Sequence, residues 1–160
     1  MPTSGWRYCD KCHALFWDGN ADKGHCAAGG GHQAAGYRFV LPSNKPESSV
    51  GQINWRHCGR CRVLFFNGYP EKGSCASGGA HSATTPDFWL NHDVPASNTA
   101  QPHWRYCGKC HSLYFDGYRD KGHCPAGGGH AAAGWNFVLA HAPEPGHGFG
   151  DDYVGVPVSG

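Results

Sequence analysis

The sequence predicts a small all-β protein stabilised by metal ions and built from three tandem zinc-ribbon-like repeats packed together. Three observations support this fold class: a cysteine motif occurs three times, short apolar runs end in Asp-Gly or Asn-Gly, and glycine is abundant. The 160 residues include 25 glycines and 9 cysteines, and only 16% are charged. Divided into thirds, the chain gives units near the size at which metals or disulfides usually supply the missing stability.

The first element of each repeat is the segment Trp-Arg-x-Cys-x-x-Cys, which begins at Trp6 and recurs at equal spacing at Trp55 and Trp104. Each copy then ends in Cys-x5-His, so every cysteine of the chain belongs to the motif. The predicted ligand sets are Cys9, Cys12, Cys26 and His32; Cys58, Cys61, Cys75 and His81; and Cys107, Cys110, Cys124 and His130.

Three thiols and one imidazole with a Cys-x2-Cys knuckle match a tetrahedral zinc site. Nine cysteines cannot all pair as disulfides, whereas three Cys3His sets use all nine. Iron or cobalt could fill the same tetrahedron, but thiolate and imidazole ligands disfavour calcium and magnesium. We therefore expect three Zn²⁺ ions per chain. Four protein ligands leave no open position for water or substrate, so their role is expected to be structural.

Short strands and hairpins are predicted within each repeat. Aromatic and branched residues alternate with period two near the opening tryptophan and again at 37–41 and 135–139. Between them lie Leu15-Phe16-Trp17-Asp18-Gly19 and its two counterparts, where an apolar run ending in Asp-Gly or Asn-Gly is a strong hairpin signal. Each repeat is thus expected to hold three or four short strands round a metal knuckle.

The domain boundaries follow from the repeat. We expect repeats at 1–44, 51–93 and 101–142, followed by a Gly/Pro-rich tail at 143–160 in which 153–158 could add an edge strand. The connecting segments are polar and contain proline, which favours separate modules joined by tethers. Three units with about four strands each also suit a closed pseudo-threefold, β-trefoil-like barrel, which is the alternative fold.

A resemblance accompanies these motifs. The segment Trp-Arg-Tyr-Cys-Gly-Lys-Cys-His-x-Leu-Tyr-Phe-Asp-Gly, followed by Lys-Gly-His-Cys-Pro-Ala-Gly-Gly-Gly-His, resembles a tandem zinc-ribbon-like repeat of bacterial and some fungal proteins. Such repeats sometimes lie beside secreted or carbohydrate-active domains, so the resemblance implies a binding function. The second repeat departs from the pattern at Arg62, Asn67, Ser74 and Ala80.

Several residues recur in register without being needed for metal. An acid or amide at the hairpin tip, a lysine and adjoining aromatic rings could together bind a sugar, whose hydroxyls take polar partners while its C–H face stacks on a ring. A structural role in turns and ion pairs is the competing interpretation. The candidate ligand-binding residues are Asp18, Lys23, Asn67, Tyr69, Lys72, Asp116, Tyr118, Lys121, Trp17, Phe66 and Phe115. For Trp6, Trp55 and Trp104 a place in the core is favoured over binding.

The sequence thus predicts a multivalent, lectin-like protein that binds a glycan or polysaccharide, since three weak sites on one body gain avidity toward a repetitive target. No catalytic triad or carboxylate pair recurs in all copies, so we do not expect an enzyme. One alternative is a zinc-knuckle binder of RNA or single-stranded DNA, supported by Lys11, Arg60 and Lys109 but weakened by a net charge of +1. The other is a self-assembling or protein-interaction repeat.

Nothing in the sequence resembles a targeting or membrane-spanning segment. Residues 1–5 carry neither a basic region nor an apolar run before the first tryptophan, and no stretch approaches the length of a membrane span. We therefore expect the chain to be cytoplasmic or exported without a leader. The sequence does not indicate its oligomeric state.

Overall fold

The computed structural model describes residues 3–142, and in this part of the chain it contains nine β-strands and no helix. Each repeat contributes one long strand, one short strand and a second long strand in that order. The strands are β1 (Thr3–Cys9), β2 (Leu15–Trp17), β3 (Ala34–Leu41), β4 (Gly51–His57), β5 (Leu64–Phe66), β6 (Phe88–His92), β7 (Ala100–Cys107), β8 (Leu113–Phe115) and β9 (Ala132–Ala140). The all-β fold class is confirmed. The predicted edge strand at 153–158 lies outside the described residues.

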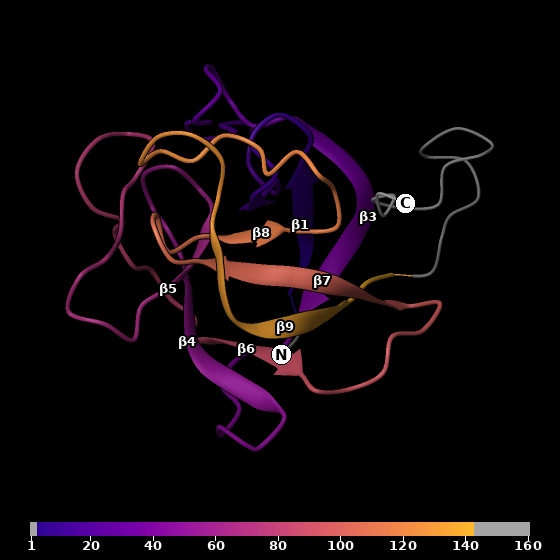
Figure 1. Cartoon of the computed structure of the whole chain (residues 1–160). Helices are drawn as coiled ribbons and strands as arrows, with labels where there is room; N and C mark the ends of the chain where they lie inside the picture. The colour runs from indigo at the N-terminus through magenta and orange to yellow at the C-terminus, as the bar shows by residue number, and fades with distance from the viewer. Residues whose placement is uncertain (1–2, 143–160) are drawn as a thin grey trace.

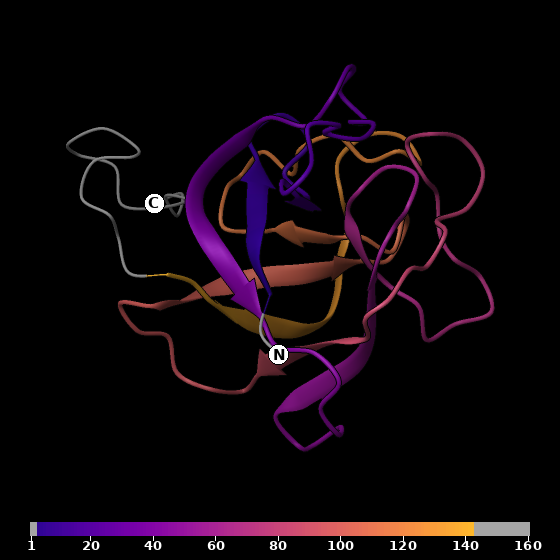
Figure 2. The same cartoon turned by 180° about the vertical axis from the view of Figure 1, so that it is seen from behind.

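Within each repeat the first strand pairs antiparallel with the other two. β1 lies between β2 and β3, β4 between β5 and β6, and β7 between β8 and β9. The short strands cover the predicted apolar runs, but the Cys-x2-Cys knuckle forms the turn that pairs each of them with the strand before it. The Asp-Gly and Asn-Gly turns end these strands and lead into loops, so the hairpin turns predicted there are wrong. Figure 2 shows the first repeat from behind, with β3 curving along β1.

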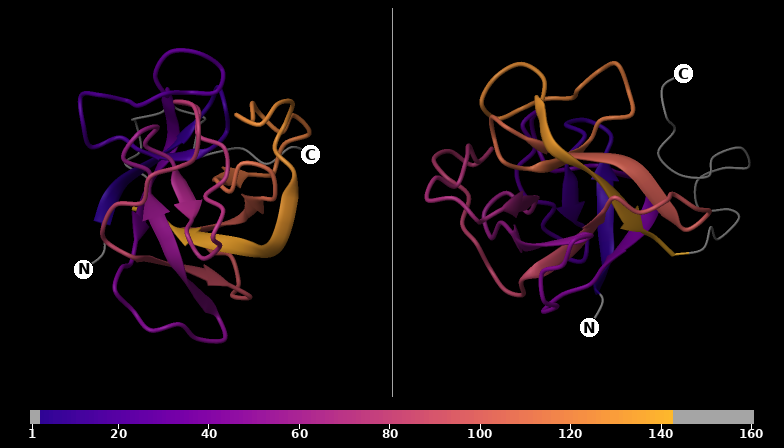
Figure 3. Two further views of the ribbon diagram at one scale, coloured as in Figure 1. Left: turned by 90° about the vertical axis from the view of Figure 1, so that its left-hand side faces the viewer. Right: turned by 60° about the horizontal axis from the view of Figure 1, so that its bottom comes forward.

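The long strands of different repeats also pair with one another. β6 joins β9 through the pair His92–Phe137, which puts six strands of the second and third repeats into one sheet. Ser43, just after β3, bridges to Phe88 of the second repeat, and Phe39 of β3 bridges to His141 of the third. These three contacts occupy equivalent positions in the repeats, so the long strands form a nearly closed ring (Figure 1). Figure 3 shows β9 curving between β6 and β7.

The short strands close a second ring in the same way. β2 bridges to the second repeat at Phe16–Val63, and the second repeat bridges to the third at Phe65–Ser112. A bridge from Tyr114 to Ala14 returns to the first repeat. The arrangement therefore has the pseudo-threefold character of the alternative barrel fold. The polar connecting segments, which had favoured separate modules, instead run over the surface of this closed body.

The first connecting segment is ordered by specific contacts. The Trp89 indole N–H donates to Pro46 O at 3.1 Å, and Lys45 Nζ lies 3.9 Å from the centre of the same ring. The Asn44 N–H donates to Asp87 O at 2.8 Å. These bonds tie the connection to the second repeat, so its polar composition reflects exposure rather than a flexible tether.

The core is threefold and dominated by large side chains. One tryptophan, one phenylalanine and two leucines from each repeat meet in a single cluster, which is the size of core that a lone repeat of this length could not form. The structure confirms that the three motif tryptophans are buried in the core. The cluster includes Trp6, Trp55, Trp104, Phe39, Phe88, Phe137, Leu15, Leu64, Leu113, Leu41, Leu90 and Leu139.

Candidate metal centres

The structure gathers the twelve predicted ligands into three groups. In each repeat the three cysteines and one histidine are buried, and their four ligand atoms lie within 4.8 Å of one another. All nine cysteines are free thiols. The residues that the spacing predicted to share a metal are therefore the residues that the fold brings together.

The distances within each group fit a tetrahedral metal. Cys9 Sγ lies 3.8 Å from Cys26 Sγ, and Cys12 Sγ lies 3.5 Å from His32 Nδ1. The corresponding distances in the other two groups are 3.9 Å and 3.5 Å. Zn–S bonds of about 2.3 Å and Zn–N bonds of about 2.0–2.1 Å give tetrahedral edges of about 3.8 Å and 3.5 Å. The donor set and its spacing thus suit Zn²⁺, which would crosslink the loops of one repeat.

The knuckle turn shapes the first half of each centre. The His13 N–H donates to Cys9 O at 2.8 Å, and His13 has a φ of 72°, which turns the chain sharply after Cys12. The Cys12 N–H then points at Cys9 Sγ at 3.5 Å, as an N–H does toward a thiolate. The same turn recurs at Arg62 and His111.

The glycine-rich loop supplies the remaining ligands and is held by the knuckle. Lys11 Nζ donates to Gly29 O at 2.6 Å and to Gly31 O at 3.0 Å, and Arg60 contacts Ala80 O at 2.7 Å in the second repeat. Lys109 repeats the arrangement in the third repeat. These cations, which the nucleic-acid alternative assigned to phosphate, thus contact backbone carbonyls of their own repeat.

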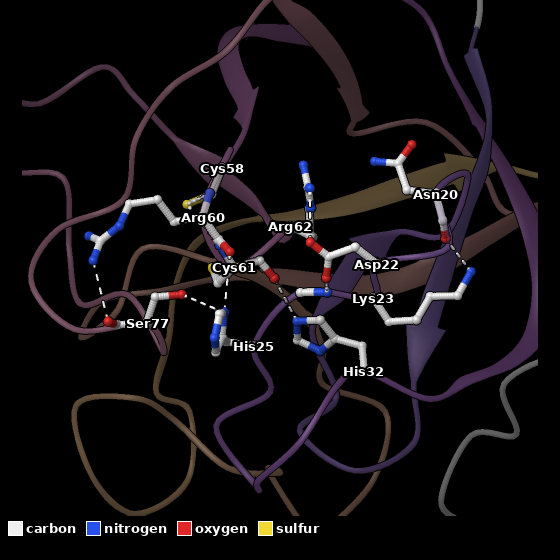
Figure 4. Close-up of polar contacts among 11 residues, drawn as sticks. Asn20, Asp22, Lys23, His25, His32, Cys58, Arg60, Cys61, Arg62 and Ser77 are labelled. Carbon is white, nitrogen blue, oxygen red and sulfur yellow. Dashed lines mark hydrogen bonds and ion pairs between the residues drawn. The ribbon is translucent and has the colours of Figure 1, made fainter.

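Each histidine of the candidate metal centres connects two repeats. His32 turns Nδ1 toward its own thiols, and its Nε2–H donates to Cys61 O of the second repeat at 2.9 Å (Figure 4). His81 donates to Cys110 O of the third repeat, and His130 donates to Cys12 O of the first, both at 2.9 Å. Such partners fix the tautomer and orientation of a ligating imidazole. The three centres therefore form a cycle.

An aromatic ring covers each imidazole. His32 stacks on Phe16 with 4.8 Å between ring centres, and His81 and His130 stack on Phe65 and Tyr114 at 4.7 and 4.6 Å. The short strand of each repeat carries this ring, so the apolar run that the sequence predicted as a strand also orients the fourth ligand.

The pKa shifts in the second centre show which protons a bound cation would displace. A hydrogen bond with Cys61 lowers the pKa of Cys58 to about 2, and the same partner lowers the pKa of Cys75 to about 4. Hydrogen bonds with Cys58 and Cys75 raise the pKa of Cys61 well above its usual value. Burial disfavours a charged His81, but hydrogen bonds to the Cys58 and Cys75 thiolates outweigh it and raise its pKa to about 9. Without a metal ion these interactions favour protons on Cys61 and His81, which a bound cation would displace.

The predicted polar ligand-binding residues lie together in the loop that follows each short strand. Lys23 Nζ lies 2.8 Å from the Asp18 carboxylate and donates to Asp18 O and Asn20 O at 3.0 and 2.6 Å. Lys121 pairs with Asp116 at 2.9 Å. Lys72 donates to Asn67 O at 2.9 Å, which keeps the backbone contact although Asn67 has no charge. These contacts give the polar residues a role in the turn, while their role toward a ligand stays a prediction.

The predicted aromatic residues separate into two groups. Phe115 is fully buried in the core, and Tyr118 is half-buried against Tyr8. Trp17 and Phe66 are half-buried and line cavities between repeats, and Tyr69 is 50% exposed beside Phe66. Sequence reasoning missed Trp135, which is 43% exposed. The sequence signal for Trp135 is that its position in the repeat is aromatic here and in the first copy, which has Tyr37, while the second copy has Pro86.

The comparisons with known proteins give no match to a family model, to a curated protein or to a solved structure. The described part of the chain contains no helix that is long and apolar enough to cross a membrane.

Proposed function

We propose that this protein is a multivalent carbohydrate-binding protein on a scaffold of three structural zinc sites, with no catalytic activity of its own. The metal ions would stabilise the repeats, and ligands would bind in the aromatic hollows between them.

The observation that carries the proposal is a pair of exposed aromatic rings in one hollow. Among residues 3–142, Tyr69 and Trp135 are the exposed large hydrophobic residues, at 50% and 43%. Both line the hollow between the second and third repeats, together with Phe66 and Tyr106. Exposed apolar groups gathered in one place often mark a binding site, and paired rings present apolar faces that suit the C–H face of a sugar.

Trp135 is also held in place. Its ring stacks on His92 with 3.7 Å between centres and 6° between planes, which links the third repeat to the second. Tyr69 packs edge-on against Phe66 at 5.3 Å. Rings ordered before binding lose little conformational entropy when a ligand stacks on them.

The proposed test is a glycan array on the zinc-loaded chain, followed by calorimetric titration of the best ligand. Tyr69→Ala and Trp135→Ala should each weaken binding by about tenfold, because stacking on a ring contributes on the order of 1 kcal/mol. Tyr69→Phe and Trp135→Phe keep a ring and should retain most of the affinity. Zinc content and melting temperature serve as controls for folding.

The same titration separates the proposal from nucleic-acid binding. Binding of a neutral glycan should change little between 50 and 200 mM salt, whereas binding through phosphate contacts falls steeply over about that range. A chain that binds no glycan on the array, or that binds equally well without both rings, contradicts the proposal.

A further inference from the structure

A cavity of about 170 Å³ lies between the first and second repeats. This volume is below the range of about 300–1,000 Å³ typical of pockets for drug-sized ligands, so it suits one small ring. Both repeats contribute to its walls. The lining includes Trp6, Trp17, Asn20, His57, Pro86 and Phe88.

One wall residue carries a buried hydrogen-bond donor without a partner. Trp6 is 1% exposed, and its indole Nε1 has no hydrogen-bond partner among residues 3–142. The equivalent indoles are satisfied, since Trp55 donates to Gln52 at 2.9 Å and Trp104 donates to Gln101 at 3.1 Å. The first repeat has Thr3 where the others have glutamine, as the pairing of Thr3 with Leu41 in β1 and β3 shows. A buried N–H without a partner destabilises the fold, so its presence at Trp6 requires an explanation.

A second wall residue carries a buried acceptor. Thr84 Oγ1 donates its proton to His57 O at 2.9 Å, so this oxygen accepts from His57 Nδ1 at 2.8 Å. With the proton on Nδ1, Nε2 is left as an acceptor, and it too is buried and without a partner in the described chain. The Trp6 and His57 rings lie edge to face with 6.1 Å between their centres. Trp6 and His57 therefore both line this cavity, and each carries a buried nitrogen without a partner, one a donor and the other an acceptor.

Comparison with the hollow between the second and third repeats explains why the cavity between the first and second repeats is larger. Tyr69 and Tyr106 line the hollow between the second and third repeats, whose volume is about 70 Å³. Asn20 and His57 occupy the corresponding positions in the first cavity, and each is smaller than the tyrosine it replaces. Asn20 and His57 thus leave a larger space than the two tyrosines do, and the glutamine that satisfies the indole in the other copies is replaced by Thr3 in the sequence.

We infer that this cavity is a specific sugar subsite, which binds one pyranose ring through neighbouring hydroxyl groups. One hydroxyl oxygen accepts from Trp6 Nε1–H, a hydroxyl proton is donated to His57 Nε2, and the C–H face packs against the rings of Trp17 and Phe88. A hydroxyl is both donor and acceptor, so a diol satisfies both wall groups at once. The inference rests on the proposed function and assigns the selective site to the first and second repeats.

The experiment follows the indole N–H signals of the zinc-loaded chain by ¹H–¹⁵N NMR. The probes are trans-1,2-cyclohexanediol and the methyl glycosides of glucose, galactose, mannose and N-acetylglucosamine. The Trp6 signal, identified by its loss in Trp6→Phe, should shift during titration, while the Trp104 signal should not. Trp104→Phe removes an N–H that already has an internal partner and is the matched control.

Thr3→Gln is the decisive variant because it should stabilise the fold while closing the site. It supplies Trp6 with the acceptor that Gln52 and Gln101 provide elsewhere, so the melting temperature should hold or rise and zinc content should stay at the wild-type value. Binding of the probes should weaken by about tenfold or more, as expected for loss of one buried hydrogen bond to the ligand and of space in the cavity.

Two results would overturn the inference, and each can be told apart from failure of the proposed function. Affinity for a glycan that is unchanged in both Trp6→Phe and Thr3→Gln places the sugar elsewhere and leaves carbohydrate binding intact. A Trp6 signal that no probe shifts means that the cavity holds only water. The proposed function fails separately, through a glycan array without binding or through binding that is unchanged when Tyr69 and Trp135 are both replaced.

Discussion

At the scale of single residues, each metal-binding histidine uses both ring nitrogens. In the second centre His81 Nδ1 faces the thiols, and its Nε2 donates to Cys110 O in the next repeat. The sequence predicted the first role from spacing but could not predict the second, because the acceptor is a backbone carbonyl in a different repeat. A carbonyl has no sequence signature, so only the fold reveals it.

The protonation of this centre predicts how zinc binding depends on pH. In the metal-free fold at pH 7, Cys61 and His81 hold protons, because the pKa of Cys61 is raised and that of His81 is about 9. Zinc must displace both. Its apparent affinity should therefore rise with pH, by about a hundredfold per pH unit near pH 7 and by about tenfold above pH 9, where His81 is already neutral.

Chelator competition between pH 6.5 and 9.5 measures this slope, and calorimetry in buffers of different ionisation enthalpy counts the protons released. Both measurements are made on the wild-type chain, whose three centres have the same donor set. Release of about three protons per zinc at pH 7 would contradict the prediction, because it is expected of three ordinary thiols in an unfolded metal-free chain.

The contacts between Lys121 and Asp116 lead us to expect different effects from two substitutions in the third repeat. Asp116→Asn should change the free energy of unfolding by less than about 1 kcal/mol, because the pair with Lys121 is partly exposed. Lys121→Met should cost more, about 1 to 2 kcal/mol, since it also loses backbone bonds to Asp116 O and Tyr118 O. Urea unfolding measures both. Asn67, which occupies the position naturally, is the internal control, and a larger loss for Asp116→Asn would contradict this order.

At the scale of elements, the local sequence predicts where the strands lie, but it does not predict which strands of different repeats pair. Leu15–Trp17 was predicted as a hairpin arm and forms β2, and the alternating run at 37–41 forms the end of β3. The pairing of β6 with β9 could not be predicted, because repeated strands offer equivalent edges to one another. Closure of the ring of repeats also depends on close backbone contacts at glycines. In the sequence these glycines are visible only as a recurring Lys-Gly pair.

Substitution of one such glycine should strongly destabilise the junction of the first two repeats. Gly24 has a φ of +74°, and a Cβ placed there would lie 2.3 Å from Cys61 O, the carbonyl that accepts from His32. Gly24→Ala should therefore destabilise the fold by about 3 kcal/mol or more, from backbone strain and displacement of the neighbouring repeat.

Gly29→Ala is the matched control. Gly29 has a φ of +105° but nothing within 4 Å of the added Cβ, so it should lose only about 1 to 2 kcal/mol from the backbone. Thermal unfolding of the zinc-loaded variants measures the difference. Equal losses at the two positions would show that the close approach to Cys61 O does not matter.

At the scale of the whole molecule, the three centres are coupled through the shared core and the histidine cycle. His32, His81 and His130 each donate to a cysteine carbonyl of another repeat. Loss of one metal should release the histidine of its repeat and so weaken the next centre. The polar connecting segments favoured independent modules, and nothing local in the sequence indicates that the modules share one core.

Cys75→Ala tests this coupling. It should remove the second zinc, reduce zinc below two ions per chain under mild chelation, and lower the stability of the entire chain by several kcal/mol. Elemental analysis and the melting temperature measure these effects. Two tightly held ions and an unchanged unfolding transition for the rest of the chain would instead indicate independent repeats.

The direction of the histidine bonds also fixes the number of repeats. A linear stack of repeats can gain or lose a unit, provided that its ends are capped. Here the bond from His130 returns to Cys12, so the first and third repeats cap each other, and none of the three repeats in residues 3–142 is a terminal unit. A fourth copy inserted by gene duplication would have to open both rings of strand contacts, and a chain shortened to two would leave the His81 donor without its acceptor on Cys110. Copy number in this protein is therefore set by ring closure, and related chains with the same junctions should vary in their loops rather than in their number of repeats.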